Sequence, residues 1–295
     1  MTFSVPDLAK RKQQRQPIVM VTAYDYPSAR FAEQAGVDVI LVGDSAANVV
    51  LGLERTTSIT MDTMVVLAAA ARRGAPRALL AGDLPFMTYQ ASDADAVRNA
   101  GRFVAEAGCD AVKLEGGGAM VRRVKAIGGA GIAVIGHLGL LPQSAARFGG
   151  MRVQARTHER AIALLDDALA LQDAGAVAIV LEAIPSEIAA AVTERLSVPT
   201  VGIGAGSGCD GQVLVFHDVL GLGAGAPPSF VRQYAALGEA TRDALAHYAA
   251  DVRERRFPAE QEGYRISADE LAAFEQALAA RDASTRAGAP AGRPA

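Results

Sequence analysis

The chain has 295 residues, of which 51% are hydrophobic, enough for one large core of the size that a parallel α/β barrel needs. Its formal net charge of -3 provides no broad cationic surface and argues against nucleic acid as a partner. No uninterrupted apolar run reaches the roughly 20 residues that a membrane span requires.

The first fifteen residues are polar throughout, which is not typical of an apolar secretory signal. Only two cysteines occur, Cys109 and Cys209, and they form no CxxC pair. We therefore expect a cytoplasmic protein that does not associate with a membrane. Residues 10–15 are basic, and we expect them to form the solvated end of an N-terminal helix, with a binding patch as the alternative.

Eight apolar runs have the length of strands buried on both faces. They span, in chain order, residues 17–24, 38–44, 77–83, 111–116, 132–137, 177–182, 199–205 and 213–218. Stretches with helical spacing lie between most of them, at residues 27–35, 61–73, 92–107, 120–127, 157–174 and 186–196. This alternation predicts repeated βα units and a parallel sheet.

Local signals agree with these helices. Ser92 precedes an alanine-rich stretch with Asp93 and Asp95 in its first turn, where carboxylates meet the positive end of the helix dipole. Four helical stretches are followed by a glycine that could form a left-handed cap, namely Gly36, Gly74, Gly108 and Gly175. Because no GxGxxG follows the first strand, we favour a closed (β/α)8 barrel over a doubly wound open sheet.

The pattern changes after Asp218. A loop rich in glycine and proline covers residues 221–228, and two helices are expected at residues 230–253 and 268–280. The remaining residues have little to bury, so we expect them to be disordered. We accordingly assign residues 1–264 to one barrel domain, 265–280 to a C-terminal helix and 281–295 to a tail.

Three acids end successive predicted strands, namely Asp44, Asp83 and Glu115. A parallel barrel brings the carboxyl ends of its strands to one face, which is where catalysis occurs in such folds. Three carboxylates gathered there repel one another unless a cation or a proton compensates them. Oxygen ligands of this kind suit Mg²⁺. For any one of these acids, a helix cap or a surface loop position is the alternative.

Lys113 lies two residues before Glu115, so both side chains point to the same face of the strand. A lysine inside a barrel is costly unless it pairs with a carboxylate or an anionic ligand. A structural ion pair with Glu115 or a neighbouring acid and substrate binding are therefore both open for Lys113, and the two are compatible. For His137, which follows another apolar run, a core position and a site position are equally open.

Glu182 ends an apolar run with no basic residue near it in the sequence. Partial desolvation would raise its pKa toward that of a useful general base, although a cap on the helix near Ser186 is the alternative. Ser45 could donate to an anionic substrate group. Residues 202–211 are rich in glycine but lack the Lys-Ser/Thr ending of a Walker loop, so we expect a close approach of the backbone there.

Several phrases of the chain resemble the 3-methyl-2-oxobutanoate (ketopantoate) hydroxymethyltransferase family. They occur in that family's order over about residues 3–264 and include VILVGDS, LLAGDLPF, AVKLEGG, GHLGLLPQS, FGGMRVQ, VLEAIP, VGIGAGSGCDGQVLV and HDVLGL. The resemblance implies a (β/α)8 barrel of the phosphoenolpyruvate/pyruvate type, a bound Mg²⁺ and a step in pantothenate biosynthesis. It also implies a homo-oligomer, such as a decamer.

The resemblance further implies that the chain transfers a hydroxymethyl group from 5,10-methylenetetrahydrofolate to 3-methyl-2-oxobutanoate, which gives 2-dehydropantoate. Carried over by motif, Asp44, Asp83 and Glu115 are the metal-site acids. The 2-oxo acid contacts are Asp44, Ser45, Asp83, Lys113 and His137, and the catalytic base is Glu182. In this chemistry Mg²⁺ stabilises the enolate oxygen, and the enolate carbon attacks the one-carbon unit of the folate.

The chain departs from the family pattern at a few places. Ala155 stands where glycine is usual, and Met151 stands where an aromatic residue is common. One rival hypothesis keeps the fold but assigns a lyase or phosphonomutase reaction, and it is weakened because neither cysteine lies in a KKCGH-like loop. A barrel without catalytic activity is the other rival, and the intact acid cluster argues against it.

Overall fold

In the computed structural model, which describes residues 2–223 and 225–287, eight parallel strands close into a barrel in sequence order. The strands are β1 (Ile18–Thr22), β2 (Val39–Val42), β3 (Leu79–Asp83), β4 (Ala111–Glu115), β5 (Ala133–Gly139), β6 (Ala176–Glu182), β7 (Thr200–Ile203) and β8 (Gly211–Leu214). The predicted α/β barrel is therefore confirmed.

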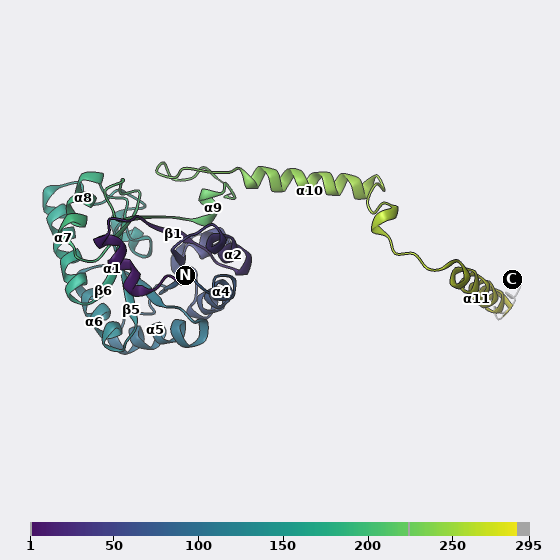
Figure 1. The fold of residues 1–295 in the computed structure, drawn as a ribbon, viewed down its shortest axis with the longest axis horizontal. Helices are drawn as coiled ribbons and strands as arrows, with labels where there is room; N and C mark the ends of the chain where they lie inside the picture. The colour runs from purple at the N-terminus through teal and green to yellow at the C-terminus, as the bar shows by residue number, and fades with distance from the viewer. Residues whose placement is uncertain (1, 224, 288–295) are drawn as a thin grey trace, which may run out of the picture. The chain divides into compact units, whose positions relative to one another are not determined.

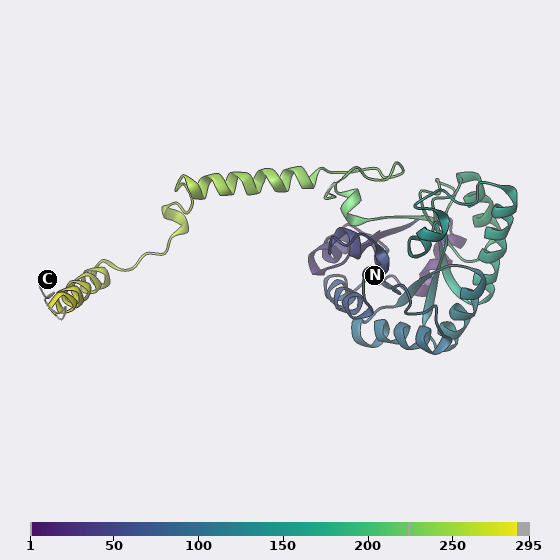
Figure 2. The same ribbon diagram turned by 180° about the vertical axis from the view of Figure 1, so that it is seen from behind.

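Helices surround the barrel, as the two opposite views show (Figures 1 and 2). The outer helices are α2 (Tyr26–Gln34), α4 (Met61–Gly74), α5 (Asp93–Ala107), α6 (Val121–Gly129), α7 (His158–Asp173) and α8 (Ser186–Arg195). Short elements lie in the loops: α3 (Ala46–Val49), α9 (Phe216–Val219) and the 3-10 turns Thr56–Ser58, Gly118–Met120 and Pro142–Phe148. The six predicted outer helices are found within two residues of their expected bounds.

The apolar side chains form two layers because alternate residues of each strand point to opposite faces. The inner cluster fills the barrel and includes Met20, Leu41, Leu79, Ile135 and Val180. The larger outer cluster packs between the strands and the surrounding helices. This alternation decides which strand-end side chains reach the inside of the barrel.

Helix α1 (Val5–Gln13) contributes to the inner cluster through the fully buried Leu8. The predicted helix in the basic stretch is present, but two of its cations form ion pairs instead of being only solvated. Lys12 Nζ lies 2.7 Å from Asp210 Oδ2, and Arg11 Nη2 lies 2.8 Å from Asp38 Oδ1. These ion pairs hold the helix to loops at the amino ends of strands.

Three of the four predicted glycine caps have a left-handed backbone, with φ of +83° at Gly36, +70° at Gly108 and +99° at Gly175. The prediction for Gly74 was wrong. This residue is the last of α4, and a Cβ atom there would lie 2.2 Å from the carbonyl oxygen of Tyr26. Its small size is needed because α2 and α4 pack closely, not because the chain turns.

The eighth strand begins and ends earlier than predicted. Its backbone pairs with β1 only from Gly211 to Leu214, and Phe216 N then donates to Thr22 Oγ1. The residues that follow form helix α9. The apolar sequence after Leu214 is therefore explained by a short helix at the barrel rim and not by a longer strand.

The first C-terminal helix, α10, covers Leu237–Arg253 and starts seven residues later than expected. The delay has a clear cause, because Tyr234 N, Leu237 N and Gly238 N donate to the carbonyls of residues 219–221. The second helix, α11 (Ala268–Ala287), continues seven residues into the tail that we expected to be disordered. The rest of that tail, residues 288–295, lies outside the described residues.

The described residues up to Gly238 form one compact unit, and those from Glu239 onward form a second. The barrel unit therefore ends before the expected limit at residue 264. The reason is that α10 has no buried residue. Among the described residues, none of the helices is both long and apolar enough to cross a membrane.

Candidate active site

Strand periodicity places five of the predicted site residues on the inner face of the barrel. Asp83, Lys113, His137 and Glu182 each follow, by two residues, a member of the inner apolar cluster, and Glu115 follows Lys113 by two. The strand register sets Asp83 beside Lys113 and Glu115 beside His137. The carboxyl ends of β3, β4, β5 and β6 thus bring these side chains together, as the sequence predicted.

The ammonium group of Lys113 pairs with Asp83. Its Nζ lies 2.7 Å from Asp83 Oδ1 and 2.9 Å from Oδ2, and both residues are almost fully buried. Burial opposes the charge of Lys113, but Asp83 and the nearby acids outweigh it and raise its pKa. Burial also raises the pKa of Asp83, and the charges of Asp44 and Glu115 add to that effect. The predicted ion pair exists, and its partner is the neighbouring acid Asp83 rather than Glu115.

Gln143 joins the other two acids. Its side-chain Nε2 donates to Asp44 Oδ2 at 3.0 Å, and its backbone N–H donates to Glu115 Oε2 at 3.0 Å. Tyr89 fixes the orientation of this amide, because its hydroxyl lies 2.8 Å from Gln143 Oε1. Asp44 also reaches Asp83, since its backbone N–H donates to Asp83 Oδ2 at 3.2 Å. All three acids therefore belong to one connected network.

His137 lies between two carboxylates. Its Nε2 is 3.2 Å from Glu182 Oε2, and its Nδ1 is 3.5 Å from Glu115 Oε1. Neither ring nitrogen is aligned for a hydrogen bond within the described part of the chain, although the ring is buried. Burial and the charge of Lys113 lower the pKa of His137, but the two carboxylates outweigh them and raise it to about 9. Of the two open interpretations of His137, the geometry favours a site position.

Glu182 is the most accessible of these acids, with 14% of its side chain exposed. The sequence shows no basic residue near it, yet the fold supplies His137 from the neighbouring strand. Gly139 makes this possible. Its φ is +96°, and a Cβ atom there would lie 2.2 Å from the carbonyl oxygen of Glu182. Residue 139 therefore has to be glycine for β5 and β6 to end side by side.

Ser45 follows Asp44 at the start of α3. Its Oγ lies 2.8 Å from the hydroxyl of Tyr24, a fully buried residue in the loop after β1. The structure thus holds the Ser45 hydroxyl beside the acid network. Its role in binding substrate remains a prediction.

The glycine-rich segment 202–211 lies against α8 rather than forming a cradle. A Cβ atom on Gly206 would lie 2.4 Å from Cβ of Ser186, and one on Gly208 would lie 2.7 Å from Cβ of Ala190. The predicted close approach of the backbone accounts for both glycines. Cys209 lies in this segment, and Cys109 is buried just before β4, so neither cysteine reaches the inner strand ends.

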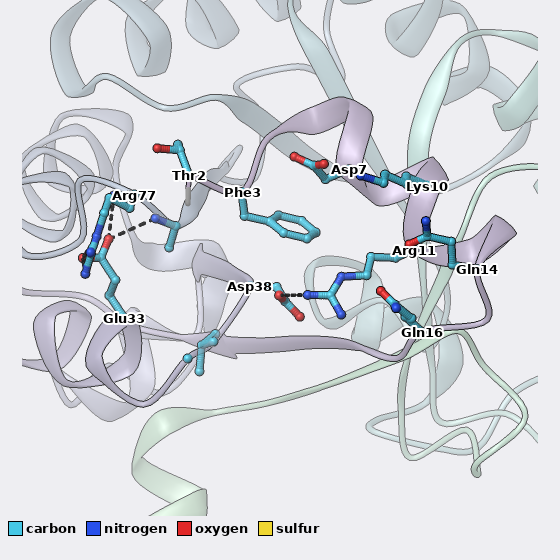
Figure 3. Close-up of a pocket in the computed structure, with 13 residues that line it drawn as sticks. Thr2, Phe3, Asp7, Lys10, Arg11, Gln14, Gln16, Glu33, Asp38 and Arg77 are labelled. Carbon is cyan, nitrogen blue, oxygen red and sulfur yellow. Dashed lines mark hydrogen bonds and ion pairs between the residues drawn. The ribbon is translucent and has the colours of Figure 1, made fainter.

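A charged cavity lies at the opposite end of the barrel (Figure 3). It has a volume of about 490 Å³ and lies beside α1. Both of its arginines have partners, because Arg11 pairs with Asp38 and Arg77 pairs with Glu33. This cavity is remote from the predicted site residues, and none of them lines it.

The acid network could supply some of the ligands of a metal ion, but not a complete set. Among the described residues, no three His, Cys, Asp or Glu side chains converge closely enough to enclose one. Glu115 Oε1 is nevertheless buried without a hydrogen-bond partner among the described residues, and Asp44 and Asp83 supply further carboxylate oxygens in the same network. Mg²⁺ is commonly held by one or two carboxylates, with water and substrate completing its octahedron. The donor set suits such an arrangement.

Gln143, Tyr89 and Tyr24 belong to the network but were not predicted as site residues. Gln143 lies in the phrase GHLGLLPQS, and Tyr24 ends the first apolar run, residues 17–24. Their place in these motifs is the one sequence signal that could have identified them as site residues. No spacing rule points to them, because each reaches the site from a loop whose path depends on the whole barrel.

Similar solved structures support the fold. Phosphonopyruvate hydrolase superposes with a TM-score of 0.59 at 15% identity, with 97% of this chain and 99% of that chain covered. The enzyme 2,3-dimethylmalate lyase, described as a PEP mutase/isocitrate lyase superfamily member, gives a TM-score of 0.55 at 18% identity over 98% of this chain and 100% of its own. At these identities the likeness shows the barrel type alone.

Sequence relatives are much closer. A protein of Moorella thermoacetica named 3-methyl-2-oxobutanoate hydroxymethyltransferase is 52% identical over 262 residues, which cover 89% of this chain and 97% of the relative. A protein of Deinococcus radiodurans with the same name is 51% identical over 271 residues, or 91% of this chain and 95% of the relative. A family model described as ketopantoate hydroxymethyltransferase matches residues 2–260. The chain therefore belongs to the ketopantoate hydroxymethyltransferase family, and it is a hydroxymethyltransferase of 3-methyl-2-oxobutanoate in pantothenate biosynthesis.

Proposed function

We propose that the one-carbon donor is 5,10-methylenetetrahydrofolate, that the reaction uses Mg²⁺, and that Glu182 is the base. One observation carries this proposal. The carboxyl ends of the strands hold an acid network that includes Lys113, and Glu182 lies apart from it on a neighbouring strand, where His137 is the side chain that joins the two within the described residues. One group of side chains can thus bind the 2-oxo acid while another carboxylate takes its proton.

Asp44, Asp83 and Glu115 would hold the metal. A bound Mg²⁺ supplies Lewis-acid polarisation of the 2-oxo group, which makes the adjacent C3–H bond more acidic. A solved structure of phosphonopyruvate hydrolase, a fold relative at 15% identity, is a complex with oxalate and Mg²⁺. Oxalate resembles the carboxylate and keto oxygens of a 2-oxo acid, which agrees with this arrangement.

Lys113 and Ser45 would bind the anionic end of the substrate. Lys113 is buried beside Asp83, so its ammonium group is held in one place and can neutralise an incoming carboxylate without reorganising. Ser45 keeps its hydroxyl fixed through Tyr24. Together with Asp44 and Asp83 these side chains orient the 2-oxo acid so that C3 faces Glu182.

Glu182 would then remove the C3 proton. His137 Nε2 lies 3.2 Å from Glu182 Oε2, so an ion pair between the two can hold the carboxylate in one orientation. The C3–H electrons form a new bond from C3 to the methylene carbon of the folate as one of its two C–N bonds breaks. Water then supplies the hydroxyl oxygen as the second C–N bond breaks, and the two freed nitrogens take up the C3 proton and a proton of the water, which gives tetrahydrofolate. Proximity of both substrates in one site provides the orientation that this step lacks in solution.

The test is exchange of the C3 proton in D2O, followed by NMR with 3-methyl-2-oxobutanoate, Mg²⁺ and no folate. We expect exchange with the wild type, none after EDTA, and a loss of about 10²- to 10⁴-fold in Glu182→Gln. Glu187→Gln removes an exposed carboxylate five residues away and is the control. Undiminished exchange in Glu182→Gln would rule out this residue as the base.

We further propose a homo-oligomer in the cytoplasm, with the decamer as one such assembly. Support comes from the C-terminal helices, whose large apolar side chains are exposed, among them Leu245, Tyr248, Phe274 and Leu278. Both cysteines are free, which agrees with a reducing compartment.

A further inference from the structure

A second cavity adjoins the candidate site from the other side of β5. Its volume is about 400 Å³, and it lies between the loop after β5 and the first half of α7. His137 points into the barrel, and the next residue, Leu138, points outward and lines the cavity. Gly117 and Gly139 also line it, and they follow Glu115 and His137 by two residues each. The site and the cavity thus share a rim.

The rim is fixed by hydrogen bonds. Gln154 N donates to the carbonyl of Ala183 at 2.9 Å, which ties the loop to the residue after the candidate base. Gly118 N donates to Asp167 Oδ1 at 2.8 Å. Ala155, which lines the cavity, has a left-handed φ of +53°, so its position is one that favours glycine. The family's usual glycine at this position has the same explanation.

The lining combines apolar surface with two free cations. Leu138, Leu141, Phe148 and Leu164 supply the apolar part. Arg147 and Arg160 are exposed, and neither guanidinium has an ion pair or a side-chain hydrogen bond within the described part of the chain. Asp167 is the one acid among the lining residues, and it already accepts from Gly118. Such a lining suits an elongated ligand with an aromatic ring and an anionic end.

We propose that this cavity binds the aminobenzoyl-glutamate part of the folate co-substrate. The inference rests on the proposed folate donor and states where on the protein this donor binds. The benzoyl ring would pack against Phe148 and Leu141, and Arg147 and Arg160 would bind the glutamate carboxylates, for which the guanidinium fork is well shaped. The pteridine and its one-carbon unit would then extend over Gly139 toward Glu182.

Two other cavities fit this ligand less well. The cavity beside α1 lies at the far end of the barrel, and its arginines Arg11 and Arg77 are already paired. The cavity of about 1040 Å³ beside β8 comes near the site at Ile184, two residues after Glu182, but Arg232 is the one cation among its lining residues. Of these three cavities in the described part of the chain, only the one between β5 and α7 combines a rim shared with the acid network and two unpaired cations.

The experiment compares 5,10-methylenetetrahydrofolate with 5,10-methylenetetrahydropteroate, which lacks the glutamate, as one-carbon donors. For the wild type, we expect the KM of the pteroate to be at least about tenfold higher, the size of one lost charge-assisted hydrogen bond. The double variant R147A/R160A should raise the KM of the folate by about the same factor and use both donors equally. Its KM for 3-methyl-2-oxobutanoate and its folate-free C3 exchange should stay at wild-type values.

The matched control is Arg152→Ala, which removes an exposed arginine from the same loop that does not line the cavity. It should leave the preference between the two donors intact. If R147A/R160A still discriminates against the pteroate, or if Arg152→Ala has an equal effect, the cavity is not the glutamate site. If the wild type itself makes no product from the folate, the proposed donor fails instead, and the two failures are thereby distinguished.

Discussion

Gln143 shows how a single uncharged side chain organises a charged site. Its amide donates both to Asp44 and to the carbonyl of Leu84, and its backbone N–H holds Glu115. Buried donors and acceptors are costly to leave unpaired, so each partner depends on the others. The acids are therefore held in position before any substrate arrives.

We predict that Gln143→Leu destabilises the protein by about 1–3 kcal/mol, because Asp44 and the Leu84 carbonyl lose a buried donor. Urea unfolding measures this change. Gln154→Leu is the control, since its side chain donates only to the exposed carbonyl of Arg152, and it should change stability by less than about 0.5 kcal/mol. Equal stability of Gln143→Leu and the wild type would show that the network is not held by this amide.

At the level of elements, side chains at the amino ends of the strands hold helices to the barrel, while the carboxyl ends hold the candidate site. Glu33, the residue before the last of α2, accepts from Arg77 N at 2.5 Å and from Ala78 N at 3.0 Å, immediately before β3. Burial alone would raise the pKa of Glu33, but these hydrogen bonds and Arg77 lower it below the ordinary value of 4.5. One side chain thus joins a helix end to a strand start.

A lowered pKa in the folded state means that ionised Glu33 stabilises the fold above its unfolded pKa, and that this contribution is lost as the pH falls through the folded pKa. We predict that Glu33→Gln costs about 1.5–3 kcal/mol at pH 7, the range for hydrogen bonds to a charged group, and much less near pH 3. Urea unfolding across this pH range tests it. The control is Glu194→Gln, at an exposed position on α8, which should show no pH-dependent loss of stability relative to the wild type. A loss of stability in Glu33→Gln that does not shrink at low pH would contradict the interpretation.

For the whole molecule, the C-terminal unit matters because several of its large apolar side chains are exposed. On α10, Leu245, Tyr248 and Val252 follow helical spacing on one face, with exposed fractions of 61%, 55% and 44%. Exposed apolar surface of this kind marks contacts with other chains. The stripe therefore belongs to the proposed subunit interface.

We predict that L245E/Y248E lowers the assembly mass measured by light scattering after size exclusion, because two buried charges oppose association. The control A240E/H247E places two glutamates on the opposite face of α10 and should keep the wild-type mass. Circular dichroism should show an intact barrel in both. A wild type that elutes at the 30.5 kDa of one chain would contradict the oligomer itself.

The sequence by itself determined the barrel, most strand and helix positions, and which acids and which lysine gather at the candidate site. Strand length, alternation and caps are local properties, and the side-chain period of two sends Lys113 and Glu115 to one face whatever lies around them. It also determined the family, since the motifs carry that information without coordinates.

Only the tertiary structure decided how those residues meet. The pairing of Lys113 with Asp83 and the placement of His137 beside Glu182 depend on strand register, which no single strand encodes. Gln143 reaches Asp44 across 99 positions of sequence, and α10 starts late because residues 219–221 accept its first hydrogen bonds. Contacts of this kind form only when the barrel closes, because closure brings strand ends and loops together that are distant along the chain.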